Sequence, residues 1–235
     1  RNKKKLDEIK EKFNLKVDTL VAEGDNLEAL RVLAGQTKVI LSTAGPFARY
    51  SDLMVQACVE QGTHYTDITG ENHWVKTLID RHHDNANLKG VRIVPSCGYD
   101  SIPSDIGTLF TVSQFDKPVK RVDLFQEMQG GASGGTIETA FSMGKLSKEM
   151  RHPFLLNPEN SFTEEQQKNS KDDMRIEKID ELNAWSGMFV MAAGNTRVVR
   201  RSAALMEQNQ RGYGANFTFG EYGLHKNKKL ARRAS

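Results

Sequence analysis

The chain has no long apolar run and very little cysteine. Nowhere among its 235 residues do about eighteen apolar residues follow one another, so the sequence predicts no transmembrane segment. Its two cysteines, Cys58 and Cys97, are too few for a disulfide framework, and they predict reduced thiols in an intracellular compartment. Within that expectation the cytoplasm, an organelle matrix and a membrane or lipid surface all stay open.

Metal-binding motifs are also missing. No group of histidine, cysteine or carboxylate side chains has the spacing of a zinc site. His82 and His83 are adjacent on an expected helix, so they cannot both face one metal ion. We predict no metal centre.

Positive charge is in slight excess and gathers near the two ends of the sequence. The net charge is +3, with basic clusters at Lys3–Lys5 and from His225 to Arg233. A nucleic-acid-binding protein usually shows a basic face with interleaved aromatic side chains, which this sequence lacks, so no nucleic-acid partner is expected. We interpret both clusters as solvated surface, with an anionic partner as the alternative.

The first 115 residues alternate between helical and strand patterns with short connections. This alternation predicts an α/β fold with a parallel, doubly wound sheet that carries helices on both faces. Val39–Leu41 is a compact apolar run of the kind found in strands buried on both faces. The expected helices are 1–13, 27–33, 52–61, 74–86 and 104–112, and the expected strands are 17–22, 39–41, 64–69 and 91–95.

The alternation stops after Phe115, and a second, α+β region follows. Its expected strands are 119–128 and 215–221, and its expected helices are 136–148 and 195–205. A glycine-rich segment, Gly130–Gly135, precedes the first of these helices, and residues 157–180 are polar with little periodicity.

Unusual residues follow the expected strands of the first region. In a parallel α/β sheet the ligand crevice lies outside the carboxyl ends of the strands. Four segments should therefore face that crevice: Gly24–Asp25, Thr43–Pro46, Thr69–Glu71 and Cys97–Ser101.

Four long motifs resemble a known family. They are Val39–Phe47 (VILSTAGPF), Gly62–Glu71 (GTHYTDITGE), Val91–Gly107 (VRIVPSCGYDSIPSDIG) and Asn195–Leu205 (NTRVVRRSAAL). Together they resemble the saccharopine dehydrogenase-like oxidoreductases, which include the trans-acting enoyl reductases of lipid synthesis. The resemblance covers roughly residues 1 to 222.

The resemblance implies a Rossmann-like fold that lacks its first strand and glycine turn. Members of the family open with a strand, a glycine turn of the GASGFTG type, a helix and a second strand that ends in AGRN, and Arg1–Lys3 resembles the tail of that segment. We therefore expect residues 1–115 to form a partial dinucleotide-binding domain and residues 116–235 an α+β domain for substrate binding or dimerisation.

The resemblance also implies a cofactor, NADP, with NAD the weaker alternative. Arg1 follows the place where the second strand should end, and an arginine there accommodates the 2′-phosphate of NADP. The turn after the strand at 39–41 should meet the nicotinamide half, and the turn after the strand at 17–22 should meet the adenine end. The expected cofactor-binding residues are Arg1, Asp25, Thr43, Ala44, Gly45, Pro46 and Phe47.

The segment from Cys97 to Asp105 carries the largest number of chemical groups at a strand end. We expect Tyr99, Asp100 and Ser101 to be catalytic, because they can orient or protonate a substrate beside the hydride path. Ser104 has an equally good structural explanation as a helix N-cap, and Asp105 as a first-turn charge that complements the helix dipole.

A further set of residues is expected on the substrate side, each with a structural alternative. Cys97 has no histidine near it in sequence to lower its pKa, which favours a small buried residue over a nucleophile. The glycine-rich segment is not a Walker motif, and its alternative is a tight turn. The expected substrate residues are Glu71, Cys97, Gly134, Gly135 and Arg197, the last of which could instead be a surface charge.

The resulting hypothesis is an NADP-dependent oxidoreductase that transfers hydride to or from a small-molecule or acyl, lipid-like substrate. The alternative is a non-catalytic family member that serves as a structural subunit of a larger assembly. A homodimer or a place in a larger complex is compatible with both hypotheses.

Overall fold

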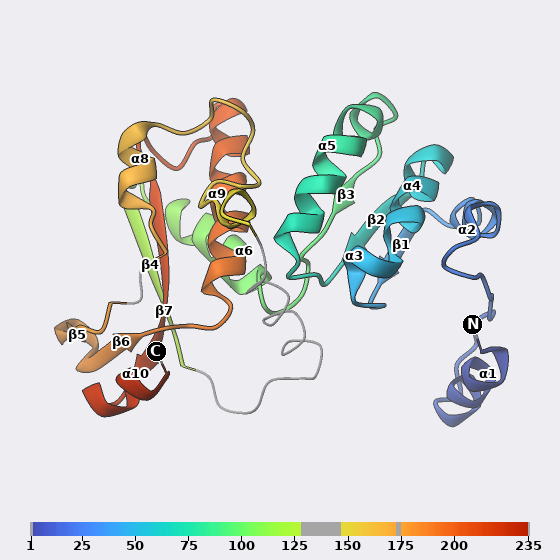
Figure 1. Ribbon diagram of the computed structural model, residues 1–235, viewed down its shortest axis with the longest axis horizontal. Coiled ribbons are helices and arrows are strands. Elements are labelled where there is room, and N and C mark those ends of the chain that lie inside the picture. Colours follow the sequence, from blue (N-terminus) through green and yellow to red (C-terminus); the bar gives the residue numbers. More distant parts are fainter. Residues whose placement is uncertain (1, 128–146, 173–174, 235) are drawn as a thin grey trace. The chain divides into compact units, whose positions relative to one another are not determined.

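The computed structural model describes residues 2–127, 147–172 and 175–234 (Figure 1). These residues fall into two compact units. The first comprises Arg1–Asp67 and Leu78–Pro95, and the second comprises Ile68–Thr77 and Ser96–Ser235. The domain boundary expected after residue 115 stays a prediction.

The first unit is built on a three-stranded parallel sheet, as the alternation of helix and strand predicts. Its strands lie in the order β1-β2-β3, and the register pairs Val39 with His64 and Tyr65 with Ile93. The strands are β1 (Val39–Ser42), β2 (His64–Asp67) and β3 (Ile93–Val94), and the helices are α1 (Lys3–Lys12), α2 (Leu27–Ala34), α3 (Phe47–Tyr50), α4 (Asp52–Gln61) and α5 (Asn72–Leu88), whose first residues belong to the second unit.

Helix α4 shows how the local sequence sets an element. Gly62 follows its last residue in the left-handed conformation at φ 76°, which glycine adopts without steric cost and which ends the helix as expected. Val55, Ala57 and Cys58 on this helix are completely buried, so α4 supplies much of the apolar core of the first unit. Burial raises the pKa of the Cys58 thiol to about 12, which keeps it protonated and unreactive.

Two expectations for the first unit are wrong. Residues 17–22 form no strand, although they are apolar and β-branched, because no strand among the described residues pairs with them. Strand β1 is not buried on both faces either, since Val39 is 51% exposed and Leu41 is 69% exposed. The strand lies at an edge of the sheet, and nothing in the described part of the chain covers these two side chains.

The second unit is built on a mixed sheet in the order β4-β7-β6-β5, in which β4 and β7 are parallel and the other pairs are antiparallel. Its strands are β4 (Arg121–Gln126), β5 (Lys178–Ile179), β6 (Ala184–Gly187) and β7 (Thr218–His225). Its helices are α6 (Ile102–Val112), η1 (Glu149–Arg151), α8 (Glu164–Asn169), η2 (Asp180–Leu182), α9 (Ala192–Gln208) and α10 (Lys228–Ala234). This arrangement confirms the predicted α+β character.

Helices α6 and α9 pack together, and α9 also packs on β7 (Figure 1). The apolar core there is centred on Val199, Tyr213, Phe217 and Phe219. The segment 157–180, expected to be a loop, contains the short helix α8, which begins with a capping box. The helix expected at 136–148 and the glycine-rich segment lie largely or wholly outside the described residues.

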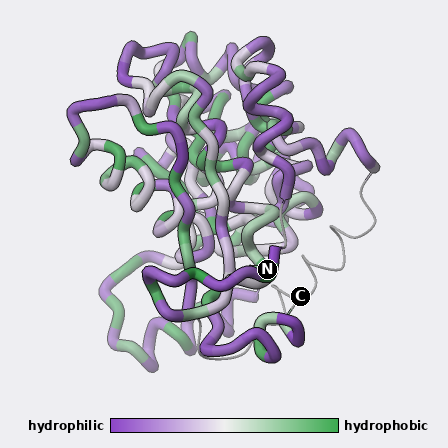
Figure 2. The backbone as a smooth tube through the Cα atoms, turned by 90° about the vertical axis from the view of Figure 1, so that its left-hand side faces the viewer, coloured by the Kyte–Doolittle hydropathy of each residue, from purple (hydrophilic) through white to green (hydrophobic). Residues whose placement is uncertain are grey.

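Hydrophobic residues occur along the chain only in short stretches between hydrophilic ones (Figure 2). None of the described helices is long and apolar enough to cross a membrane.

We predict that Val199→Ala destabilises the second unit. Val199 is completely buried in its core, so the loss of two methyl groups leaves a cavity and should lower the free energy of unfolding by roughly 1–3 kcal/mol. Urea unfolding of the variant measures this loss. Val32→Ala, at an exposed position of α2, is the matched control and should change stability by no more than about 0.5 kcal/mol. Equal effects at the two positions would contradict the assignment of Val199 to the core.

Candidate functional site

The turn after β1 presents accessible backbone at the carboxyl end of the first sheet. Thr43, Ala44 and Gly45 are exposed, whereas Phe47 is buried and begins α3. A Cβ atom on Gly45 would lie 3.2 Å from the Phe47 ring, so a larger residue would crowd this ring. Small residues at such a turn let a ligand approach the backbone closely, and the cofactor contact expected of this turn stays a prediction.

Two buried polar side chains lie just behind this turn, and the sequence motifs did not identify them. Tyr65 and Asp67 face the same side of β2, and Asp67 pairs in register with Ser42 at the end of β1. Burial raises the pKa of the Tyr65 phenol, and the charge of Asp67 raises it further, while Ser51 lowers it. The phenol is therefore neutral at physiological pH. Its two-residue spacing from Asp67 was the available sequence signal.

Asp25, which was expected to meet the adenine end of the cofactor, is exposed in the turn before α2. The N-cap of that helix is the next residue, Asn26, whose Oδ1 accepts a hydrogen bond from the Ala29 amide at 3.0 Å. Asp25 is therefore free of a capping role, and its contact with a cofactor stays a prediction.

In the second unit, a buried polar cluster surrounds Ser101. The Ser101 hydroxyl donates to Asn195 Oδ1 at 2.9 Å, and Asn195 Nδ2 donates to Glu221 Oε1 at 3.2 Å. Ser104 Oγ donates to the same carboxylate oxygen at 2.7 Å, and Gln126 Nε2 does so at 3.1 Å. One cluster thus joins α6, α9, β4 and β7.

Glu221 is the centre of this cluster and is only 3% exposed. Burial raises its pKa, against the opposing effect of the hydrogen bonds from Ser104, Gln126 and Asn195. All three donors meet Oε1, while Oε2 is buried without a hydrogen-bond partner among the described residues. Such an arrangement suits a carboxyl group that spends part of its time protonated.

The three expected catalytic residues differ in their surroundings. Tyr99 is 85% exposed and Asp100 is exposed as well, whereas Ser101 is 4% exposed. The loop that carries them packs closely, because a Cβ atom on Gly98 would lie 3.1 Å from Ile68. Ser101 is thus the member of the trio whose side chain has a fixed position.

The structural explanation offered for Ser104 is wrong. Helix α6 begins at Ile102 with Ser101 at its N-cap position, so Ser104 lies inside the first turn and its hydroxyl faces Glu221 instead. Asp105 accepts a hydrogen bond from Ser202 Oγ at 3.0 Å, and burial raises its pKa. Both side chains therefore face the interior of the second unit.

The remaining substrate residues are also placed within the second unit. Glu71 is buried just before α5, and its backbone amide donates to Thr69 Oγ1 at 3.1 Å. Cys97 is half-buried. Arg197 is buried and donates to Asp172 Oδ1 at 2.5 Å and to the Arg151 carbonyl at 2.6 Å, contacts that use much of its guanidinium. Arg1, Gly134 and Gly135 lie outside the described residues.

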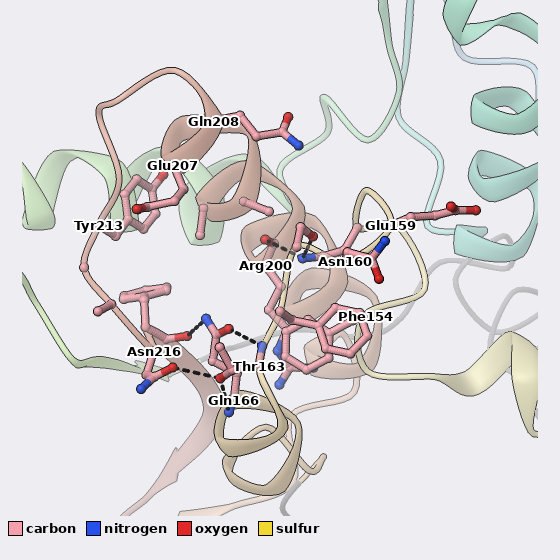
Figure 3. Close-up of a pocket in the computed structure, with 18 residues that line it drawn as sticks. Phe154, Glu159, Asn160, Thr163, Gln166, Arg200, Glu207, Gln208, Tyr213 and Asn216 are labelled. Carbon is pink, nitrogen blue, oxygen red and sulfur yellow. Dashed lines mark hydrogen bonds between the residues drawn. The ribbon is translucent and has the colours of Figure 1, made fainter.

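A pocket of about 450 Å³ opens elsewhere on the second unit, between the loop at 154–163, α9 and the segment 213–217 (Figure 3). Phe154 and Phe162 stack with ring centroids 4.4 Å apart on one side of it. At its rim, Thr163 Oγ1 donates to Asn216 Oδ1 at 2.8 Å (Figure 3). Glu159 and Glu207 also line the pocket, so it combines aromatic, neutral polar and acidic side chains.

The positively charged side chain that lines this pocket, Arg200, already donates hydrogen bonds to backbone carbonyls. Arg200 is buried, its Nη1 donates to the Pro153 carbonyl at 3.0 Å, and its Nη2 donates to the Phe219 carbonyl at 3.3 Å. Burial lowers its pKa to about 10, which still leaves it charged at neutral pH. The pocket therefore suits a neutral ligand better than the phosphates of a dinucleotide. We do not assign it to cofactor binding.

Comparison with known proteins assigns the class of the first unit. Residues 1–94 match the family model described as "Saccharopine dehydrogenase NADP binding domain". This match agrees with the parallel sheet and with the cofactor type expected from the sequence. Residues 1–94 are therefore similar to the NADP-binding domain of the saccharopine dehydrogenases, the family that the sequence motifs resemble.

Most of the chain is also similar to part of several longer mycobacterial proteins. The chain is 32% identical to the trans-acting enoyl reductase of Mycobacterium leprae, 33% identical to that of Mycobacterium ulcerans and 34% identical to that of Mycobacterium tuberculosis. Each match covers 86% of this chain and 51% of the relative. The chain thus spans about half the length of these relatives.

We predict that Glu221→Gln changes how stability depends on pH. The pKa of Glu221 is raised in the folded state above its ordinary value of 4.5, so the folded protein holds a proton that the unfolded chain has released. As the pH rises from 4.5 through the folded pKa, the wild type should lose free energy of unfolding relative to the variant.

Urea unfolding at a series of pH values measures this difference. Glu207→Gln, at an exposed position of α9, is the control and should follow the wild-type profile. Parallel profiles for the wild type and Glu221→Gln would show that the pKa of Glu221 is not raised.

Proposed function

We propose that the complete protein is an NADP-dependent oxidoreductase that acts on an acyl, lipid-like substrate. The observation that carries the proposal is the turn after β1, whose small residues Thr43–Gly45 are exposed at the carboxyl end of a parallel sheet, within residues that match an NADP-binding domain. The acyl substrate is suggested by the name of the relatives, which are trans-acting enoyl reductases.

The residues of this chain would hold the cofactor through two contacts. The turn Thr43–Phe47 would lie against the nicotinamide half, and Arg1 would pair with the 2′-phosphate. When bound, the cofactor supplies the hydride chemistry, and the protein supplies binding and orientation.

The residues of the second unit would position the substrate. Ser101 Oγ, whose proton is donated to Asn195, would accept a hydrogen bond from a polar group of the substrate, while Asn195 and Glu221 hold Ser101 in one orientation. Tyr99 and Asp100 are exposed and accessible to a substrate, and either would serve as a proton donor or acceptor. Glu71 and Cys97 would line the same side.

We predict that the complete native protein binds NADPH in preference to NADH, and that Arg1→Ala removes most of this preference. A hydrogen-bonded pair between a charged arginine and a phosphate accounts for about a tenfold to hundredfold difference in affinity. Titration by nicotinamide fluorescence measures both dissociation constants. Binding of neither cofactor would contradict the oxidoreductase and favour a structural subunit, whereas a preference for NADH would contradict the role of Arg1 and the choice of NADP as the cofactor.

We predict that Ser101→Ala lowers kcat about 100-fold while the affinity for NADPH stays the same. The expected loss follows from the removal of the one fixed hydroxyl in the strand-end loop. Ser113→Ala, at the exposed end of α6, is the matched control and should leave kcat unchanged. Circular dichroism checks that both variants are folded. An unchanged kcat in a folded Ser101→Ala variant would exclude Ser101 from the reaction.

A further inference from the structure

Positive charge is concentrated at the last residues that the structure describes. Lys226, Lys228, Lys229, Arg232 and Arg233 are all exposed, and these five cations fall within eight residues of a chain whose net charge is only +3. None of the five pairs with a carboxylate among the described residues. We call this group the α10 basic face.

The fold holds these charges on one side of a helix. At 100° per residue, Lys228, Lys229, Arg232 and Arg233 cover a single arc of α10. Ala231 lies on the other side and is completely buried, and its carbonyl packs closely on β6 at Gly187. The helix is therefore anchored by its small residue, and its cations point toward solvent.

The start of α10 is fixed as well. Asn227 Oδ1 accepts a hydrogen bond from the Leu230 amide at 3.0 Å, which satisfies one of the free amides of the first turn. The α10 basic face is thus a preformed surface, and little ordering has to accompany the binding of a partner.

Apolar and aromatic groups border the basic face. Leu230 is 41% exposed on α10 itself, and Lys228 Nζ lies 5.1 Å from the centre of the Trp185 ring on β6. Leu182, three residues before Trp185, is exposed too. Cations beside an exposed leucine and a half-buried tryptophan are the composition of helices that lie in the interface of a lipid bilayer.

We propose that α10 docks the protein on an anionic lipid bilayer. Phospholipid headgroups would neutralise the basic face, and Leu230 would enter the boundary between headgroups and acyl chains. A nucleic acid fits less well, because residues 226–234 contain no aromatic side chain for base stacking and the cations span only two helical turns. The proposal does not depend on the enzymatic function proposed above.

The number of cations on α10 sets the expected strength of binding to an anionic membrane. Each lysine or arginine near an anionic membrane raises partitioning roughly fivefold, so four cations together raise it by several hundred-fold. Because these charges stay in solvent, added salt should weaken binding steeply. Binding should be reversible and selective for anionic lipid.

The experiment is co-sedimentation of the complete native protein with vesicles of phosphatidylcholine alone or with added phosphatidylserine. We expect binding only to the vesicles that contain phosphatidylserine, and loss of binding at high salt. The double variant Lys228→Glu, Arg232→Glu should bind at least about 25-fold more weakly. Lys3→Glu, Lys5→Glu, which reverses two charges in the other basic cluster, is the matched control and should bind like the wild type.

A second variant separates a bilayer from any other polyanion. Leu230→Ser keeps every charge of α10, so it should weaken binding to vesicles severalfold and leave retention on heparin unchanged. Four results would overturn the proposal: no binding to either vesicle, equal binding to both, equal losses in the two charge variants, or tighter binding to duplex RNA than to vesicles. Circular dichroism of each variant checks folding, and the exposed positions of all five substituted residues make a failure to fold unexpected.

Discussion

A buried carboxyl group cannot be left without hydrogen-bond donors, and this requirement organises the second unit. Glu221 lies on β7 and takes donors from β4, α6 and α9, so four elements of this unit are tied at one point. The loss of one donor would remove a hydrogen bond to a buried carboxyl group at a cost of about 1–3 kcal/mol, which is more than a typical surface contact contributes. The same cluster fixes Ser101, because Asn195 links it to Glu221. The position of Ser101, in the loop after β3, therefore depends on a residue 120 positions away in sequence.

Local sequence patterns predicted most of the elements that local forces control. The helix expected at 52–61 and its glycine cap are confirmed, and the parallel order of β1, β2 and β3 follows from alternation and short connections. Val17–Ala22 shows where this reasoning fails. Its apolar, β-branched residues favour an extended backbone, but a strand also needs a neighbour to bond to, and that neighbour is not written in the segment itself.

The candidate site shows the same division. The strand-end segments could be predicted, because the order of helices and strands places them at the carboxyl ends of the strands. The hydrogen-bond partners of their side chains could not be predicted in this way. The sequence identified Glu221 only as one residue of an expected strand. Nothing in the adjacent sequence indicates that Ser104 and Asn195 donate hydrogen bonds to it. Arg197 was expected to offer its charge to a substrate, yet Asp172 and the Arg151 carbonyl, both far away in sequence, accept its hydrogen bonds. Long-range pairing of polar groups depends on the finished fold, so spacing alone does not predict it.

The uncovered edge of β1 has a consequence for the handling of this polypeptide. Val39 and Leu41 are exposed on a strand whose outer edge pairs with no other strand among the described residues. Natural edge strands are usually blunted by a charged side chain, a proline or a bulge, and Val39–Ser42 contains none of these within it. Wherever nothing covers it, this edge is a template on which a second extended chain can add. Residues 1–235 produced by themselves should therefore tend to aggregate through pairing of these strand edges. Leu41→Lys is the smallest change that would protect them, because a charged side chain on an edge strand opposes such pairing.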